Sequence, residues 1–456
     1  MRKTESTCKY RELDWLLIAL TSGIVLGLIF QTRGSTTPIL SPNDLSRWAT
    51  IYSLAERGTY QIDITPWPPS IDRIQRDGHT YSTKPPLLPT LLTGEYLLLK
   101  KLSWGRLSFQ DNPEMVIRLI VATVNLVPFI LFVLIYARFL EEQALSLWVH
   151  LFSICTATLG TYLTAFCLTL NNHTVGAFSA SFSLYGAYRI WMKGDRSAQA
   201  FLLTGLFAGF LAVNEFPAIS FLTLLTVGLL WKAPSLTLRC FIPLAMLPVA
   251  AHFLTNYAAT GTLMPAYADK QAYVFPGSYW KIDPQSGRLV GSRVDPATGT
   301  LSLTNPTMID NQYEPWYIYL FHMLIGHHGI FTLSPIFIFS FLGIYRSWRG
   351  RDNDYRIFAG MTFLLTLLML VFYTFFAGQR NYGGMSNGLR WLFWLIPFWL
   401  FFLPEGLRGC ELNRSSRGWA LACLLISAVS VFYATRNPWS RPWLHEWLFS
   451  KGWILY

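Results

Sequence analysis

Charged residues are scarce in this sequence. Only 13% of the 456 residues are Asp, Glu, Lys or Arg, whereas about a quarter of the residues in soluble domains are charged. This scarcity, with 52% hydrophobic and 16% aromatic residues, excludes a disordered chain and argues against an ordinary soluble enzyme. Apolar runs long enough to cross a hydrocarbon layer of about 30 Å recur along the chain. The sequence therefore predicts an all-α polytopic membrane protein.

Cysteine is also rare, with six residues. None lies in a segment that we assign to the outer side of the membrane. Four lie in apolar runs and two in segments assigned to the cytoplasm: Cys155, Cys167, Cys240 and Cys423, then Cys8 and Cys410. We therefore expect no disulfide framework.

Positive charge exceeds negative charge, with a formal net charge of +11. Lys and Arg accumulate on cytoplasmic loops for topological reasons, so this excess does not indicate a nucleic-acid partner. With the N-terminus inside, the short inner turns carry the Lys and Arg residues, and Arg380 is the only such residue in a short outer turn. This pattern fits about 11 transmembrane helices: 16–30, 115–137, 144–166, 175–192, 201–213, 217–231, 238–257, 329–345, 355–376, 389–403 and 418–434.

Two long segments of the single membrane domain (1–456) are predicted to lie outside: a first loop, 31–114, and a second loop, 258–326. In the first loop, 44–57 has the spacing of a short interfacial helix, and 87–99 suggests a re-entrant or interfacial hairpin. Short alternating stretches in the second loop predict a small β-hairpin cap. The tail, 436–456, is predicted to lie outside as well. We expect an integral protein of the bacterial inner (plasma) membrane, with a cytoplasmic N-terminus.

Polar residues that are unusual for a membrane protein gather on the predicted outer side. Ionisable groups at the membrane edge are costly and usually functional. The predicted topology, which rests on other residues, brings these groups to one level. The candidate site residues are Asp44, Arg47, Tyr81, Lys84, Asn172, His173, Glu215, His327, His328, Arg380, Tyr382 and Arg390.

Each of these residues also has a purely structural interpretation. Asp44 suits the N-cap of its helix, and a lone lysine such as Lys84 commonly snorkels to the interface. Arg390 could pair with a lipid phosphate. Adjacent helical residues diverge by about 100°, so His327 and His328 are not expected to ligate one metal ion. For each residue taken alone, the structural interpretation is as good as the functional one. Together, these interpretations do not explain why so many polar residues lie at the same outer edge of the membrane.

Three motifs in the first loop resemble a known family: Asp44-x-x-Arg47-Trp48-Ala49, Glu56-x-Gly58-x-Tyr60 and Asp77-Gly78-x-x-Tyr81-x-x-Lys84-Pro85-Pro86-Leu87. They are similar to the first outer loop of GT-C fold membrane glycosyltransferases, in the protein-mannosyltransferase and aminoarabinose-transferase group. The resemblance implies that Asp44 is the catalytic acid/base residue and that Lys84 contacts the donor phosphate. Amides at Asn171-Asn172 and Thr83 beside Lys84 replace acids found in some members. We therefore expect no cofactor, and a divalent metal remains the disfavoured alternative.

The function expected from these features is glycosyl transfer for the cell envelope. A polyprenyl-phosphate sugar would be the donor, and a glycan, lipid or protein hydroxyl would be the acceptor. Asp44 would take the acceptor proton as general base, with inversion, and Lys84 with Arg380 or Arg390 would neutralise the leaving phosphate. The alternative is a transporter or flippase of a lipid-linked or anionic solute, although such proteins place their sites near the midplane within repeated halves.

Overall fold

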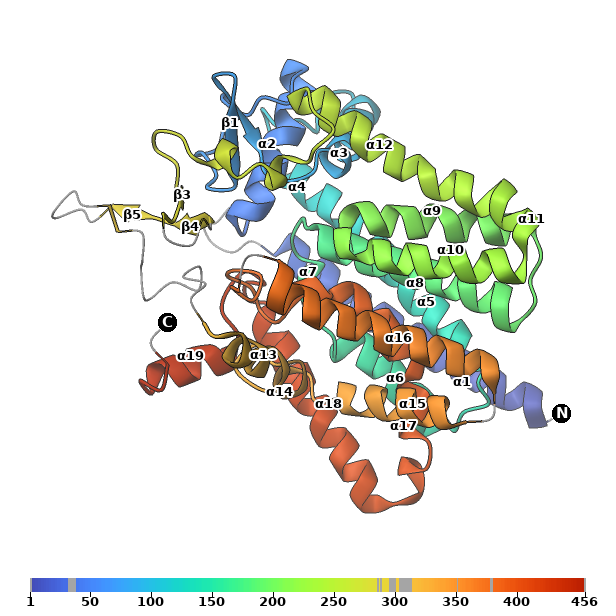
Figure 1. Ribbon diagram of the computed structural model, residues 1–456. Coiled ribbons are helices and arrows are strands. Elements are labelled where there is room, and N and C mark those ends of the chain that lie inside the picture. Colours follow the sequence, from blue (N-terminus) through green and yellow to red (C-terminus); the bar gives the residue numbers. More distant parts are fainter. Residues whose placement is uncertain are drawn as a thin grey trace.

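The fold is a bundle of helices with two chain segments packed together at one end (Figure 1). The computed structural model describes residues 2–31, 38–284, 287, 289–294, 301–302, 314–350, 352–377 and 380–454, and for residues 2–9, 293–294 and 301–302 it describes secondary structure only. The N-terminus and C-terminus lie at opposite ends of the bundle in Figure 1, and α2, β1, α13 and α19 lie toward the C-terminal end.

The α-helices outside the two long loops form the bundle, and the first loop separates α1 from α4 while the second separates α12 from α14. They are α1 (Arg2–Phe30), α4 (Pro113–Val121), α5 (Val127–Glu141), α6 (Leu147–Leu159), α7 (Leu163–Phe166), α8 (Asn172–Met192), α9 (Ala198–Asn214), α10 (Ile219–Lys232), α11 (Pro234–Leu236), α12 (Ile242–Thr260), α14 (Ile330–Leu333), α15 (Phe337–Arg349), α16 (Asn353–Val371), α17 (Ile396–Leu407), α18 (Arg414–Ala434) and α19 (Trp443–Ser450). The π-helical turns η1 (Ala122–Leu126), η3 (Thr237–Phe241) and η7 (Phe372–Phe376) and the 3₁₀ turns η2 (Phe216–Ala218), η8 (Arg390–Leu395) and η9 (Cys410–Leu412) extend or join them.

Six helical stretches in the described part of the chain are long and apolar enough to span a membrane: Tyr10–Phe30, Pro113–Glu141, Leu147–Phe166, Pro234–Thr260, Asn353–Phe376 and Arg414–Ala434. Two shorter apolar helices are Ala198–Asn214 and Phe216–Lys232. These findings support an integral membrane protein, and the count of 11 crossings stays a prediction.

The other three predicted spans differ from simple apolar helices for local reasons. Helix α8 carries Thr174, Ser179 and Ser183, which are tolerated because most of this helix is buried against protein. The span predicted at 329–345 is divided into α14 and α15 around Ser334 and Pro335, because proline disfavours helical backbone at the residue before it. The span predicted at 389–403 begins as the 3₁₀ turn η8 and continues as α17.

Small residues let α15 and α17 approach closely. A Cβ at Gly343 would lie 1.9 Å from the Phe402 carbonyl oxygen, and one at Gly406 would lie 1.8 Å from the Phe339 carbonyl oxygen. Such contacts between backbones are a common way for helices to associate where burial from water drives association weakly. The pair therefore forms a rigid base beside α8.

The first loop folds into two helices and a hairpin. Helix α2 (Pro42–Arg57) begins two residues before the predicted helix, and β1 (Arg73–Arg76) pairs antiparallel with β2 (His79–Ser82) in the register Ile74↔Tyr81. Asp77 and Gly78, with φ of 51° and 78°, make the two-residue turn. The hairpin predicted at 87–99 is wrong: α3 (Leu87–Leu102) is one continuous helix, since Pro89 lies in its first turn, where no intrahelical donor is lost.

The second loop packs on the first. It contains η4 (Ala266–Ala268), η5 (Gln271–Tyr273), the paired strands β3 (Trp280–Ile282) and β4 (Leu289–Gly291), the paired strands β5 (Arg293–Val294) and β6 (Leu301–Ser302), and α13 (Trp316–Leu324). A small apolar core joins the two loops through Ile74, Tyr273 and Trp280. An ion pair of 2.9 Å between Arg76 and Asp269 supports this contact. The two loops thus hold each other over the end of the bundle.

Candidate active site

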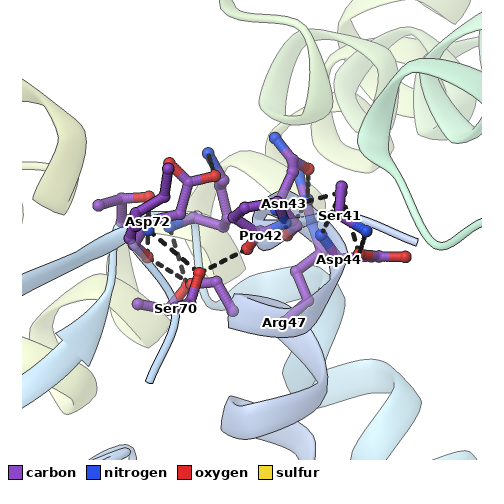
Figure 2. Close-up of polar contacts among 12 residues, drawn as sticks. Ser41, Pro42, Asn43, Asp44, Arg47, Ser70 and Asp72 are labelled. Carbon is purple, nitrogen blue, oxygen red and sulfur yellow. Dashed lines mark hydrogen bonds and ion pairs between the residues drawn. The ribbon is translucent and has the colours of Figure 1, made fainter. Parts of the chain in front are cut away.

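The N-terminus of α2 fixes the position of Asp44. Ser41 is the N-cap, with φ −154° and ψ 162°, Pro42 is the first helical residue, and Asp44 is the third. The Ser41 hydroxyl accepts from the Asp44 amide while the Asp44 carboxylate accepts from the Ser41 amide, a capping box. The N-cap is therefore Ser41, and the structural interpretation that made Asp44 the N-cap is wrong. Figure 2 draws Asp44 and Asp72 on either side of this first turn.

The Asp44 carboxylate is completely buried and well bonded. Its Oδ1 accepts from the amides of Ser41 (2.7 Å) and Leu45 (3.0 Å). Its Oδ2 accepts from the Leu40 amide at 2.9 Å and the Thr169 hydroxyl at 2.8 Å. Burial raises the pKa of Asp44 above its ordinary value, and the hydrogen bonds oppose that rise. Asp44 thus holds a proton more readily than an exposed aspartate does.

A chain of hydrogen bonds joins five of the predicted residues. Arg47 Nη2 donates to Asn172 Oδ1 at 2.5 Å, and Asn172 Nδ2 donates to Glu215 Oε1 at 2.9 Å. His173 Nδ1 lies 2.5 Å from the same Glu215 oxygen, and Arg390 Nη1 lies 2.5 Å from His173 Nε2. Helix α2, the start of α8, the α9–η2 turn and η8 each contribute to this chain. The structure therefore brings together residues that are up to 343 positions apart in the sequence (Arg47 and Arg390).

The order of donors in this chain follows from Arg390. A guanidinium can only donate, so His173 Nε2 is the acceptor and the His173 proton lies on Nδ1. Nδ1 then donates to Glu215. Glu215 accepts from both His173 and Asn172, and it is 4% exposed. Its carboxylate orients these groups from inside the protein.

A second route connects Arg390 to Asp44. The Arg390 guanidinium lies over the Trp439 ring, 5.0 Å from its centroid. Trp439 Nε1 donates to the Thr169 hydroxyl at 2.9 Å, and Thr169 donates to Asp44. The predicted outer tail thereby contributes Trp439 to the site.

Lys84 follows β2 and forms an ion pair with Asp72, with 2.9 Å between Nζ and Oδ2. Burial lowers the pKa of Lys84, which the nearby positive charges of Arg47 and Arg390 also lower and Asp72 raises. Burial likewise lowers the pKa of Arg47 to about 10, and Arg390 adds to that effect. Three cations, Arg47, Lys84 and Arg390, therefore lie close enough to oppose one another.

The remaining predicted residues do not join this group. Tyr81 packs on the apolar core of the two loops. Arg380 donates to the backbone carbonyls of Thr374 (3.1 Å) and Glu314 (2.9 Å), and so it fixes the chain rather than facing Lys84. His327, His328 and Tyr382 form a separate aromatic cluster, in which the His328 and Tyr382 rings stack with centroids 4.6 Å apart.

Asp72 is the carboxylate paired with Lys84, and the side chains of Thr83 and Asn171 are bound elsewhere. The Thr83 hydroxyl donates to the Asp72 carbonyl at 3.3 Å, and Asn171 caps α8 through its side chain. A different group, Glu314, His322 and His327, places one ligand atom of each residue within 4.8 Å of the others.

Sequence reasoning missed Asp72, Thr169 and Trp439. Asp72 lies in a loop just before β1, and residue types such as Thr169 and Trp439 occur often in membrane proteins. No local sequence pattern marks these three residues as functional. Each joins the site through a contact with a residue that is distant in the sequence.

Comparison with known proteins gives a likeness in fold. No protein-family model and no curated protein matches the chain. Among solved structures it is similar to the oligosaccharyltransferase of Archaeoglobus fulgidus in the apo form, with a TM-score of 0.47 and 12% identity. The likeness covers 96% of this chain and 57% of that one. The chain therefore spans less than two thirds of the length of the archaeal protein.

Proposed function

We propose that this protein is a membrane glycosyltransferase that moves a sugar from a polyprenyl-phosphate donor to an acceptor hydroxyl, with inversion. The observation that carries the proposal is the buried group of Arg47, Lys84 and Arg390, whose positive charges oppose one another. The carboxylates of Asp44, Asp72 and Glu215 offset part of this positive charge, and a bound anionic substrate would offset more of it. A phosphate is an anion that guanidinium and ammonium groups bind through charge-assisted hydrogen bonds.

The chemistry requires charge neutralisation at the leaving group. The acceptor oxygen forms a bond to the anomeric carbon, and the bond from that carbon to the phosphate oxygen breaks with its electron pair. The product, a polyprenyl phosphate, has a second pKa near 6, so it leaves as an anion and needs positive charge rather than a proton. Lys84 and the two arginines supply that charge.

Asp44 is the proposed general base and takes the proton of the acceptor hydroxyl. Its raised pKa suits this role, since a base works best when its pKa approaches the working pH. The acceptor hydroxyl must replace one of its present donors. We assign this to Thr169, because its hydroxyl proton can turn to another acceptor, whereas the backbone amides of Leu40, Ser41 and Leu45 are fixed and the Ser41 hydroxyl is held in the helix cap.

Asp72 is the second carboxylate of the site, and we assign it a positioning role. It pairs with Lys84 at 2.9 Å and keeps 18% of its side chain exposed. An incoming phosphate competes with Asp72 for the Lys84 ammonium, so Asp72 holds that lysine in place before the donor arrives.

The test uses the purified full chain with labelled polyprenyl-phosphate sugars and measures release of polyprenyl phosphate. We expect release together with a glycosylated acceptor, and Lys84→Met should abolish most of it. Lys101→Met is the matched control, since Lys101 is an exposed lysine at the end of α3. Movement of intact labelled donor across proteoliposomes, without release of polyprenyl phosphate, would instead support a flippase and overturn the proposal.

A further inference from the structure

Three side chains from one short stretch converge beside the candidate active site. Glu314 precedes α13, His322 lies in its last turn, and His327 lies in the turn before α14. One ligand atom from each lies within 4.8 Å of the others, and the parallel rings of His322 and His327 have centroids 3.9 Å apart. Two imidazoles and a carboxylate form a donor set typical of a transition-metal site.

A second observation points to a missing partner. His445, from α19, is 0% exposed and lies 5.0 Å from His327 between ring centroids. Neither of its ring nitrogens has a hydrogen-bond partner among the described residues, and His328 Nε2 has none either. Buried polar atoms without partners are rare and usually indicate an absent ion or water. The unpartnered ring of His445 and the unpartnered Nε2 of His328 thus border the group of Glu314, His322 and His327.

We infer that Glu314, His322 and His327 bind a Zn²⁺ ion, with the unpartnered His445 beside them as a further ligand. Imidazole nitrogen suits zinc, whereas Mg²⁺ and Ca²⁺ prefer sites made of oxygen. Ligands of a tetrahedral zinc lie about 3.3 Å apart, given bonds of about 2.0–2.2 Å. Binding therefore requires the side chains to approach one another by up to about 1.5 Å, which side-chain rotation can supply.

The surroundings hold the three ligands in place. The Tyr382 hydroxyl donates to the Glu314 carboxylate, and Arg380 donates to the Glu314 carbonyl at 2.9 Å. The His327 amide lies 3.4 Å from His322 Nδ1 and His327 Nδ1 lies 2.5 Å from His328 Nδ1. Hydrogen bonds around metal-binding side chains of this kind orient the ligands.

The turn itself permits this packing because residue 326 is glycine. A Cβ at Gly326 would lie 2.1 Å from His322 Nδ1. The ion would thus join α13, the following turn and α19, which comes from the tail more than 100 residues later. Its role is structural, and it is independent of the proposed transfer reaction.

Zinc binding is measured on the purified full chain after removal of metal with a chelator and dialysis against Zn²⁺. We expect one equivalent of zinc per chain and a thermal midpoint that rises with zinc concentration. Tyr382→Phe removes a hydroxyl that donates to the Glu314 carboxylate, and loss of such a partner typically lowers metal affinity about 10- to 100-fold. His322→Gln and His327→Gln remove proposed ligands and should lower zinc affinity further. His79→Gln, an exposed histidine in the β1–β2 hairpin, is the matched control and should bind zinc as the parent does.

Cobalt spectroscopy covers the case in which a glutamine variant fails to fold. Cobalt-loaded His327→Cys should show a thiolate-to-cobalt charge-transfer band that the parent lacks, since residue 327 contacts the metal. The inference is overturned if the parent binds no stoichiometric zinc, if both glutamine variants bind it as the parent does, or if the cobalt-loaded His327→Cys protein lacks the band.

Discussion

Lys84 and Asp72 form an ion pair of 2.9 Å in which the lysine side chain is 19% exposed and the aspartate side chain 18% exposed. The pair is therefore mostly buried, but solvent still contacts part of both side chains. Arg47 and Arg390 stand close enough to Lys84 to lower its pKa, although burial is the larger cause. Asp72 is the carboxylate paired directly with Lys84, while Asp44 and Glu215 also act on the neighbouring arginines.

Lys84→Met keeps the apolar stem of the side chain and removes its charge. A charge-assisted hydrogen bond contributes about 1.5–3 kcal/mol, so donor affinity should fall about 10- to 100-fold. Turnover should fall as well, because the leaving phosphate gains negative charge in the transition state. The measurement is donor binding and polyprenyl phosphate release, with Lys101→Met alongside. Parental behaviour of Lys84→Met would show that Lys84 only snorkels at the surface.

The pH range of high kcat/KM should be narrower than the range that an ordinary aspartate and an ordinary lysine would give. Asp44 acts only when ionised, and burial raises its pKa, so activity should fall on acidification at a higher pH than an ordinary aspartate would give. Lys84 binds phosphate only when protonated, and burial lowers its pKa, so donor binding should weaken at a lower alkaline pH than for an ordinary lysine. Lys84→Arg keeps its charge and should move the alkaline limb upward. An alkaline limb unmoved in Lys84→Arg would remove Lys84 from the explanation.

Transfer should persist in chelator at temperatures well below unfolding. Arg47, Lys84 and Arg390 supply the positive charge, while Thr83 and Asn172 carry none and donate hydrogen bonds to Asp72 and Glu215. Chelator should lower the thermal midpoint because it removes the ion proposed at Glu314, His322 and His327. The transfer rate at low temperature should stay unchanged. The contrary result is a rate abolished by chelator, with the midpoint unchanged, and restored by Mg²⁺ or Mn²⁺.

Membrane sidedness is tested by labelling single cysteines in intact cells with an impermeant thiol reagent. Cysteines in place of Arg106 and Ser450 should react, and those in place of Gln199 and Ser415 should not; all four positions are exposed. Ser46 is unsuitable because its hydroxyl is buried against Ser82. Asn305, the natural choice in the second loop, lies outside the described residues. Labelling at Gln199 or Ser415 would invert the predicted topology.

Much of the site could be predicted because its residues carry a local pattern. Asp44 and Arg47 are three residues apart on one helix, and Asn172 with His173 begins another. Positive charge on the short inner turns suggested that these groups share one level. The structure brings Arg47, Asn172, His173, Glu215 and Arg390 into one chain of hydrogen bonds, which agrees with that reasoning.

Residues that act through distant contacts could not be predicted. Asp72, Thr169 and Trp439 have no periodicity or motif that marks them. From the sequence, only His327 and His328 were considered as a pair of metal ligands. In the structure, Glu314, His322 and His445 also lie close to them. Helix α8 was predicted from its apolar residues, yet its polar face is acceptable only because other helices cover it.

The choice between Asp44 and Asp72 as the base tests the account most directly. Turnover and donor KM are measured for Asp44→Asn and Asp72→Asn, with thermal midpoints to check folding. In Asp44→Asn the new side-chain NH₂ group would face the backbone amide of Leu40 or Ser41, which costs about 1–3 kcal/mol of stability.

We predict that Asp44→Asn still binds donor and loses at least about 100-fold in turnover, because its basicity is gone. Asp72→Asn should keep near-parental turnover at saturating donor and change mainly the donor KM, since Asp72 positions Lys84 and takes no proton. Parental turnover by Asp44→Asn, or a comparable 100-fold loss in Asp72→Asn, would contradict the assignment of Asp44 as the general base.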